Sequence, residues 1–291
     1  MTESSVKTVK NYMALLRNLR NILKYNVSKE HLKKVCDALC YEPAVSKSKQ
    51  LPFRFWSAYR SLIGTPGCYS ESNIALDPFA AKQLSCALEK AIKVSVKNLK
   101  GFDENTRVLI ASDVSGSMLQ GISPKSTVQL YDIGLLLGQL FQTRCKQAIT
   151  GFFGDSWKVV NYSKEDVLSN TLNLRAREGE VGYSTNGYKV VQWLNNKNIE
   201  LDKVLIFTDC QLWNSGRGTA TLNAEWAKYT SRFPKAKLYL FDLAGSATAP
   251  LDIVEKKNVF LIAGWSEKIF EVMEAIENGG NAIDFIRNIV I

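Results

Sequence analysis

The hydrophobic pattern changes character about one third of the way along the chain. Before residue 100, apolar residues recur every three or four positions, which is the spacing of one face of an α-helix. Between Val6 and Tyr25 this stripe consists of Val9, Met13, Leu16, Leu19 and Leu23. Ser28 is a good N-cap for a second helix over 28–39, and Asp77-Pro78 begins a long helix over 78–99. The first part of the chain is therefore predicted to be α-helical.

From Thr106 onward, short apolar runs alternate with helix-like segments. The strand-like runs lie at 107–112, 147–153, 203–208, 237–243 and 259–263. The helix-like segments lie near 126–143, 187–196, 221–232 and 266–277. Strands that alternate with helices favour an α/β fold, with a mostly parallel sheet covered on both faces. We therefore expect an α-helical region over 1–102 and a doubly wound α/β domain over 103–291.

Two of the strand-like runs end in polar residues suited to a metal ion. The first run leads into Asp113-Val114-Ser115-Gly116-Ser117, and the run over 204–208 ends at Asp209. Carboxylate and hydroxyl oxygens are hard ligands, which Mg²⁺ prefers in octahedral geometry. In open α/β sheets the ligand site lies at the carboxyl ends of the strands. A serine-rich turn with an N-capping aspartate would explain the first motif but not Asp209.

This pattern resembles the metal-ion-dependent adhesion site of von Willebrand factor A domains. In that family a loop threonine is the next ligand, and Thr185 in the loop 182–187 matches it, although Tyr183-Ser184 stands where the family has two glycines. The resemblance implies a site of Asp113, Ser115, Ser117, Thr185 and Asp209. The hydroxyls would coordinate directly, and the carboxylates largely through water. The implied ion is Mg²⁺, with Mn²⁺ or Ca²⁺ as alternatives, and it keeps one position open for a carboxylate or phosphate oxygen of a partner.

The positive charge is concentrated in the helical region. Residues 1–100 carry 17 basic and 7 acidic side chains, a balance of +10, whereas the remainder carries 20 and 21, a balance of −1. A basic region beside a neutral domain favours a polyanion partner, most often nucleic acid. A helical domain that is merely lysine-rich would have the same charge. The segment 52–60 interleaves aromatic residues with arginines, and it suits either base stacking or an inward-facing aromatic core.

Two helical segments and the serine motif resemble TROVE-domain proteins, the Ro autoantigen family. The segments are Met13–Leu19 and Leu51–Tyr59, and residues 113–118 read Asp-Val-Ser-Gly-Ser-Met where the family has Asp-x-Ser-Gly-Ser-Met. The family places helical repeats before a von Willebrand A domain. The resemblance implies a ribonucleoprotein that binds small noncoding RNAs or the single-stranded ends of misfolded RNAs. The phosphate contacts expected on this basis are Lys7, Lys10, Arg17, Arg20, Lys24, Lys33, Lys34, Arg54 and Arg60.

The helical region is short for that family. In Ro-like proteins the helical repeats form a closed ring that binds RNA, and such a ring needs several hundred residues. Only about 100 residues precede the metal motif here. The chain is then a shortened member, a fragment, or one copy of an oligomer that completes the ring. Two functions stay open: an RNA-binding Ro-like protein whose metal site docks an acidic protein partner, or a scaffold module of a larger assembly without RNA binding.

Other classes of protein are not expected. The sequence has one histidine, His31, among lysines, and it lacks the phosphate-binding motifs of nucleotide enzymes, so we expect no enzyme. Its apolar runs are too short to span a membrane, and residues 1–5 do not begin a signal peptide. Cys36 and Cys40 could form half of a zinc site, but no second pair follows. The six cysteines are expected to be reduced thiols in a cytoplasmic protein.

Overall fold

The structure is a computed structural model with two compact units. It describes residues 9–25, 27–50, 52–63, 77–96, 104–123, 126–210, 221–245, 258–264 and 268–278. The first unit covers residues up to Leu99 together with 166–168, and the second covers the remainder from Lys100. Each unit has its own hydrophobic interior and is described by itself.

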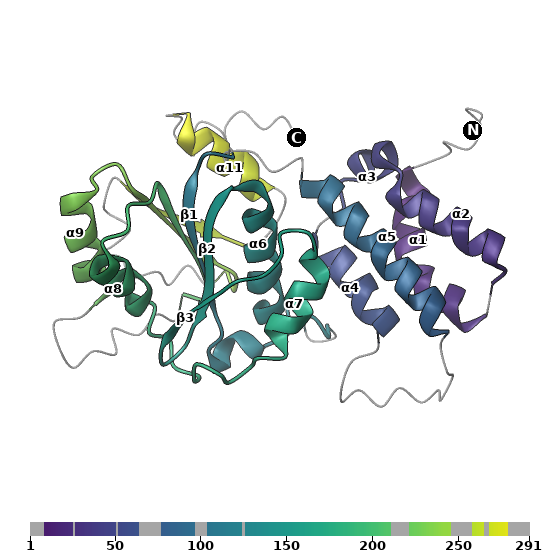
Figure 1. The fold of residues 1–291 in the computed structure, drawn as a ribbon, viewed down its shortest axis with the longest axis horizontal. Coiled ribbons are helices and arrows are strands. Elements are labelled where there is room, and N and C mark those ends of the chain that lie inside the picture. Colours follow the sequence, from purple (N-terminus) through teal and green to yellow (C-terminus); the bar gives the residue numbers. More distant parts are fainter. Residues whose placement is uncertain are drawn as a thin grey trace. The chain divides into compact units, whose positions relative to one another are not determined.

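The first unit is a bundle of α-helices (Figure 1). These are α1 (Val9–Lys24), α2 (Lys29–Cys40), α3 (Glu42–Ser48), α4 (Pro52–Ile63) and α5 (Pro78–Val96). Ser28 Oγ accepts a hydrogen bond from the His31 amide at the start of α2, and Asp77 Oδ1 accepts one from the Phe79 amide at the start of α5. Both predicted caps are confirmed. The short helix α3 was not predicted. Glu42-Pro43 was interpreted only as the end of the preceding helix, but proline is also favoured in the first turn of a helix, and here it lies in the first turn of α3.

The aromatic residues of α4 form the interior of this unit. Phe55 and Trp56 are fully buried, and the Trp56 ring stacks on Tyr59 with 6.1 Å between centroids. Tyr12 of α1 packs against Phe55 and donates a hydrogen bond of 2.9 Å to the Leu39 carbonyl. The inward-facing alternative for segment 52–60 is therefore confirmed. Tyr12, rather than the predicted Met13, occupies the buried stripe of α1.

The second unit contains a mostly parallel β-sheet. Its described strands are β1 (Arg107–Asp113), β2 (Gln147–Phe153), β3 (Trp157–Val160), β4 (Lys203–Thr208), β5 (Lys237–Asp242) and β6 (Val259–Ala263), in the order β3-β2-β1-β4-β5-β6. Only the edge strand β3 is antiparallel among them. The five predicted strands are confirmed within a residue at each end. The sequence pattern missed β3, whose four residues are too few for a periodic signal.

Helices cover both faces of the sheet (Figure 1). The described helices from residue 100 onward are η2 (Gly116–Leu119), α6 (Leu130–Arg144), α7 (Val167–Arg175), α8 (Tyr188–Lys197), α9 (Leu222–Arg232) and α11 (Lys268–Glu277); of these, η2 is a single turn after β1, and α7 begins within the residues of the first unit. On one face, Val204 and Ile206 of β4 contact α8 and α9. On the other face, Phe207 stacks on Phe241 of β5 and lies against Phe141 of α6. This alternation follows from the two-residue period of a strand and accounts for the nearly continuous apolar runs.

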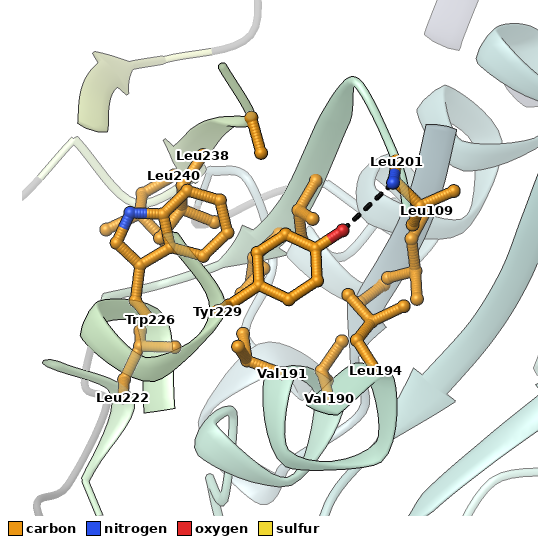
Figure 2. Close-up of a cluster of buried hydrophobic side chains, with 14 of the residues drawn as sticks. Leu109, Val190, Val191, Leu194, Leu201, Leu222, Trp226, Tyr229, Leu238 and Leu240 are labelled. Carbon is orange, nitrogen blue, oxygen red and sulfur yellow. Dashed lines mark hydrogen bonds between the residues drawn. The ribbon is translucent and has the colours of Figure 1, made fainter. Parts of the chain in front are cut away.

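The face beneath α8 and α9 has a tyrosine at its centre (Figure 2). Tyr229 is fully buried, and its hydroxyl accepts a hydrogen bond of 3.0 Å from the Leu201 amide and donates one of 3.1 Å to the Ile199 carbonyl. These bonds fix the turn that leads from α8 into β4.

Replacing Tyr229 with phenylalanine is expected to lower the free energy of unfolding by about 2 kcal/mol, because two backbone groups lose their hydrogen-bond partner. Urea unfolding followed by tryptophan fluorescence measures this. Tyr188→Phe, at a partly exposed tyrosine of α8, is the control. An unfolding free energy equal to that of the unaltered chain would show that the hydroxyl does not hold this turn.

Candidate metal centre

The centre is built around the last residue of β1. The parallel register pairs Ser112 with Phe207, which brings Asp113 beside Thr208 at the end of β4. Asp113 is fully buried, and its Oδ2 accepts a hydrogen bond of 2.7 Å from Thr208 Oγ1. Its Oδ1 accepts one of 2.8 Å from the Ser115 amide. The sheet register and the turn after β1 together fix the orientation of this carboxylate.

The two motif serines lie side by side. Ser115 is buried, Ser117 is partly exposed at the start of η2, and their hydroxyl oxygens are 3.2 Å apart. The turn that carries them is joined to the neighbouring strand by a hydrogen bond of 3.0 Å from the Val114 amide to the Phe153 carbonyl. The D-x-S-x-S motif therefore folds into a compact group of oxygen atoms.

The loop that carries Thr185 lies against this motif. The Gly116 amide donates a hydrogen bond of 3.2 Å to the Tyr183 carbonyl, and the Asn186 amide donates one of 3.1 Å to the Gly154 carbonyl. Thr185 lies between these two anchors and is 5% exposed. The structure therefore brings the loop of Thr185 to the serine motif, as the metal-site prediction requires.

A second buried carboxylate lies beside the first. Asp209 follows β4 and is fully buried. Burial raises the pKa of Asp113 to about 7; hydrogen bonds from Thr208 and Ser115 oppose this rise, and the charge of Asp209 adds to it. Buried carboxylates beside hydroxyls are a donor set that a hard divalent cation fits, and a cation there would offset their repulsion.

The raised pKa gives the metal-free protein a defined pH dependence. Between about pH 4 and pH 7, Asp113 is protonated in the folded chain, whereas in the unfolded chain, where its pKa has the ordinary value of 3.8, it is ionised. The stability from this group is therefore present below about pH 4 and is lost as the pH rises through about 7. Asp113→Asn cannot ionise and does not lose this stability. In EDTA, the free energy of unfolding of Asp113→Asn minus that of the unaltered chain should therefore increase by up to ~4 kcal/mol as the pH rises from about 4 to about 7. Thermal unfolding across a pH series measures the difference, and a constant difference would contradict the raised pKa.

Sequence reasoning missed other polar residues at this edge. Asp242 ends β5, is fully buried, and accepts hydrogen bonds from the Ala244 and Gly245 amides. The signal was available, since the predicted run 237–243 has a carboxylate, Asp242, next to its last residue. Cys210 follows Asp209 with a φ of +57°, and burial together with the charges of Asp242, Asp209 and Asp113 raises the pKa of its thiol.

Within the described ranges, cysteine and histidine side chains form no metal-binding group with the carboxylates. In the described part of the chain, Cys36, Cys40, Cys86, Cys145 and Cys210 are free thiols. Among the same residues, no group of three or more His, Cys, Asp or Glu side chains could hold a metal ion. The candidate centre therefore depends on its serine and threonine hydroxyls. Cys68 lies outside the described residues.

The predicted RNA contacts differ in their exposure. Five of them are exposed on α1 and α2, namely Arg17, Arg20, Lys24, Lys33 and Lys34. Arg54 is partly buried, with its guanidinium 4.7 Å from the centre of the Phe53 ring. Lys10 lies in α1, but its side chain and the whole of Lys7 are outside the described residues.

Arg60 departs from the prediction. It is 7% exposed, and its guanidinium lies 6.0 Å from the centre of the Trp56 ring within the aromatic interior. The sequence did not predict that Arg60 is buried, because aromatic residues and arginines alternate in this segment and members of both residue types lie in the interior of the bundle. Arg60 is therefore not a surface cation in this structure. Exposed lysines of the described helical unit that the prediction omitted are Lys29, Lys47, Lys49, Lys82 and Lys90.

The fold and the position of the centre define the class of the second unit. A doubly wound, mostly parallel sheet with buried carboxylates at the end of β1 and directly after β4 is a von Willebrand A-type α/β fold, and a helical unit precedes it in the chain. The crystal structure of the Deinococcus radiodurans RO (RSR) protein has the same fold, with a TM-score of 0.63 and 20% sequence identity over 92% of this chain and 53% of that one.

The match to a known family lies in the helical unit. Residues 8–64, which include α1 to α4, match the TROVE domain family. Over 51 residues the chain is 45% identical to Telomerase protein component 1 of Rattus norvegicus, a match that covers 18% of this chain and 2% of that protein. The predicted resemblance to TROVE-domain, Ro-like proteins is confirmed. The chain spans about half the length of the Ro structure.

No helix within the described ranges has both the length and the apolar character needed to cross a lipid bilayer.

Proposed function

We propose that this chain binds RNA through its helical unit. The observation that carries the proposal is the row of exposed cations on α1, Arg17, Arg20 and Lys24, inside the segment that matches the TROVE domain. TROVE-domain proteins are generally RNA-binding. The three residues follow one another at intervals of three and four, so they share one face of the helix while Leu16, Leu19 and Leu23 face the interior. Such a cationic face suits a phosphate backbone.

We infer a second binding function for the von Willebrand A-type unit. Ser115, Ser117 and Thr185 would hold a Mg²⁺ ion with their hydroxyl oxygens, and Asp113 and Asp209 would supply the negative charge. When bound, the ion would offer a coordination position to an acidic group of a protein partner. Thr208 would keep the Asp113 carboxylate oriented through its hydrogen bond. This is a docking function and requires no general base.

No catalytic role is proposed for the histidine. His31 is exposed at the start of α2, where its Nδ1 lies 2.9 Å from the Oγ of the capping residue Ser28. This contact supports a helix end.

A scaffold function without RNA binding is the second candidate. It is favoured by the coverage, because this chain matches only about half of the Ro structure. In this case α1 to α5 would have a structural role only, and the metal centre would be the sole binding site.

One experiment separates these two functions. Fluorescence anisotropy of the full chain is measured with a structured RNA that has a single-stranded 3′ end, across a salt series with Mg²⁺ or EDTA. RNA binding through α1 predicts submicromolar affinity that falls steeply with salt and persists in EDTA. Absence of binding at low salt would contradict the RNA function and favour the scaffold.

A further inference from the structure

The turn after β2 is joined to the loop that carries Thr185. Asp155 lies in this turn between β2 and β3, and its side chain is exposed. Its Oδ1 nevertheless accepts a hydrogen bond of 2.8 Å from the Ser184 amide. Its main-chain carbonyl accepts one of 3.3 Å from Asn186 Nδ2 and another from Lys189 Nζ. One residue thus binds the loop on both sides of Thr185.

The two segments touch through glycines. A Cβ atom at Gly154 would lie 2.2 Å from the Gly182 carbonyl oxygen, and a Cβ atom at Gly182 would lie 2.2 Å from Asp155 Oδ2. Gly182 also has a φ of +78°, which L side chains rarely adopt. The Asp155 carboxylate therefore fills the space that a side chain at Gly182 would take, and the two backbones can approach only because both positions are glycine.

The opposite side of the loop is held by the serine motif. The Gly116 amide donates a hydrogen bond to the Tyr183 carbonyl, and the next residue, Ser184, donates its amide hydrogen bond to Asp155. Tyr183 and Ser184 thus connect the loop in two directions, to the motif through a carbonyl and to Asp155 through an amide. Thr185 follows directly and is buried.

We propose that Asp155 is a positioning residue for the metal centre, which holds the loop 182–186 so that the Thr185 hydroxyl is presented beside Ser115 and Ser117. The inference rests on the proposed Mg²⁺ site. Asp155 contacts Ser184 rather than the expected ligands, so it acts on the ion through the backbone of the loop. Groups that orient the ligands of a metal commonly change its affinity by 10-fold to 100-fold when they are removed.

The test is a Mg²⁺ titration of the full chain by calorimetry. Asp155→Ala is expected to weaken Mg²⁺ binding about tenfold. Asp155→Asn keeps an oxygen acceptor for the Ser184 amide and is expected to retain most of the affinity. Glu178→Ala, which removes another exposed carboxylate from the segment leading to this loop, is the matched control and should bind as the unaltered chain does.

A double-mutant cycle shows whether Asp155 acts through Thr185. If it does, Asp155→Ala should weaken binding little further in a chain that already carries Thr185→Ala, because residues that act as a unit are not additive. A general loss of structure would instead weaken both backgrounds equally. Hydrogen exchange of the metal-free protein provides a second readout, with the Ser184 amide expected to exchange about tenfold faster in Asp155→Ala.

The outcomes distinguish the two levels of the proposal. If the unaltered chain does not bind Mg²⁺, the proposed metal site is wrong and the positioning role is overturned with it. If the unaltered chain binds and Asp155→Ala binds equally well, or the two substitutions are additive, only the positioning role is overturned. If Asp155→Ala does not fold, Asp155→Ser, which keeps a polar turn residue but has no carboxylate oxygen for the Ser184 amide, carries the test and should weaken Mg²⁺ binding as well.

Discussion

Replacing Asp113 with alanine is expected to weaken Mg²⁺ binding about 100-fold or more while the protein stays folded. Asp113 accepts hydrogen bonds from the Thr208 hydroxyl and the Ser115 amide, so its loss removes a charge and also frees the turn that carries the serines. Folding should survive, because burial already makes the ionised carboxylate unfavourable in the metal-free protein.

Calorimetric titration with Mg²⁺ measures the loss, and thermal unfolding in EDTA verifies the fold. Ser112→Ala is the matched control, since this neighbouring residue of β1 directs its hydroxyl to the Gly134 carbonyl of α6 on another side of the strand. Binding by Asp113→Ala as tight as that of the unaltered chain would overturn the proposed centre. A partner captured through the ion should be lost with Asp113→Ala and with EDTA alike.

The triple substitution of Arg17, Arg20 and Lys24 by glutamine is expected to remove most of the RNA affinity. If each side chain contacts one phosphate of a single strand, the slope of log affinity against log salt becomes shallower by about 2, at about 0.7 per contact. If the variant and the unaltered chain bind equally at 1 M salt, this difference in slope makes the variant bind about 100-fold more weakly than the unaltered chain at 0.1 M salt. The buried residues of α1 are unchanged, so the helix should persist.

The matched control makes the same change of charge in the other unit. Lys197, Lys228 and Lys235 are exposed lysines on or after α8 and α9, and their triple substitution by glutamine also lowers the net charge by three. Anisotropy across a salt series compares the two variants. An equal effect of both would show that only net charge matters, and no effect of either would favour the scaffold function.

Much of the fold could be predicted because its elements are marked by local patterns. The runs ending at Asp113 and Asp209 are apolar on both faces, as strands between two layers of helices must be, and each ends in a carboxylate at the same edge of the sheet. The caps Ser28 and Asp77 were visible because capping depends on residues two or three positions apart. The concentration of positive charge in the first 100 residues needed only counting.

Other features depend on residues that are distant in the sequence. The edge strand β3 exists because it pairs with β2, and its own four residues carry little signal. Arg60 is buried because of how α4 lies in its bundle, which periodicity within one helix does not report. Asp242 lies near Cys210 because β5 pairs with β4, and its charge then helps to raise the pKa of the Cys210 thiol.

The sequence by itself therefore determined the two kinds of region, the parallel α/β fold and the location of the charge, and each of these rests on residue type and on spacing along the chain. The candidate ligands were proposed from the sequence as well, through the resemblance of three separate segments to the von Willebrand A metal site. The tertiary structure alone decided that the aromatic residues of α4 face inward, that Thr208 orients Asp113, and that Asp155 holds the loop of Thr185. The physical reason is that these contacts join residues 95 and 29 positions apart. Strand register and loop closure set such contacts, and neither leaves a periodic pattern in the chain.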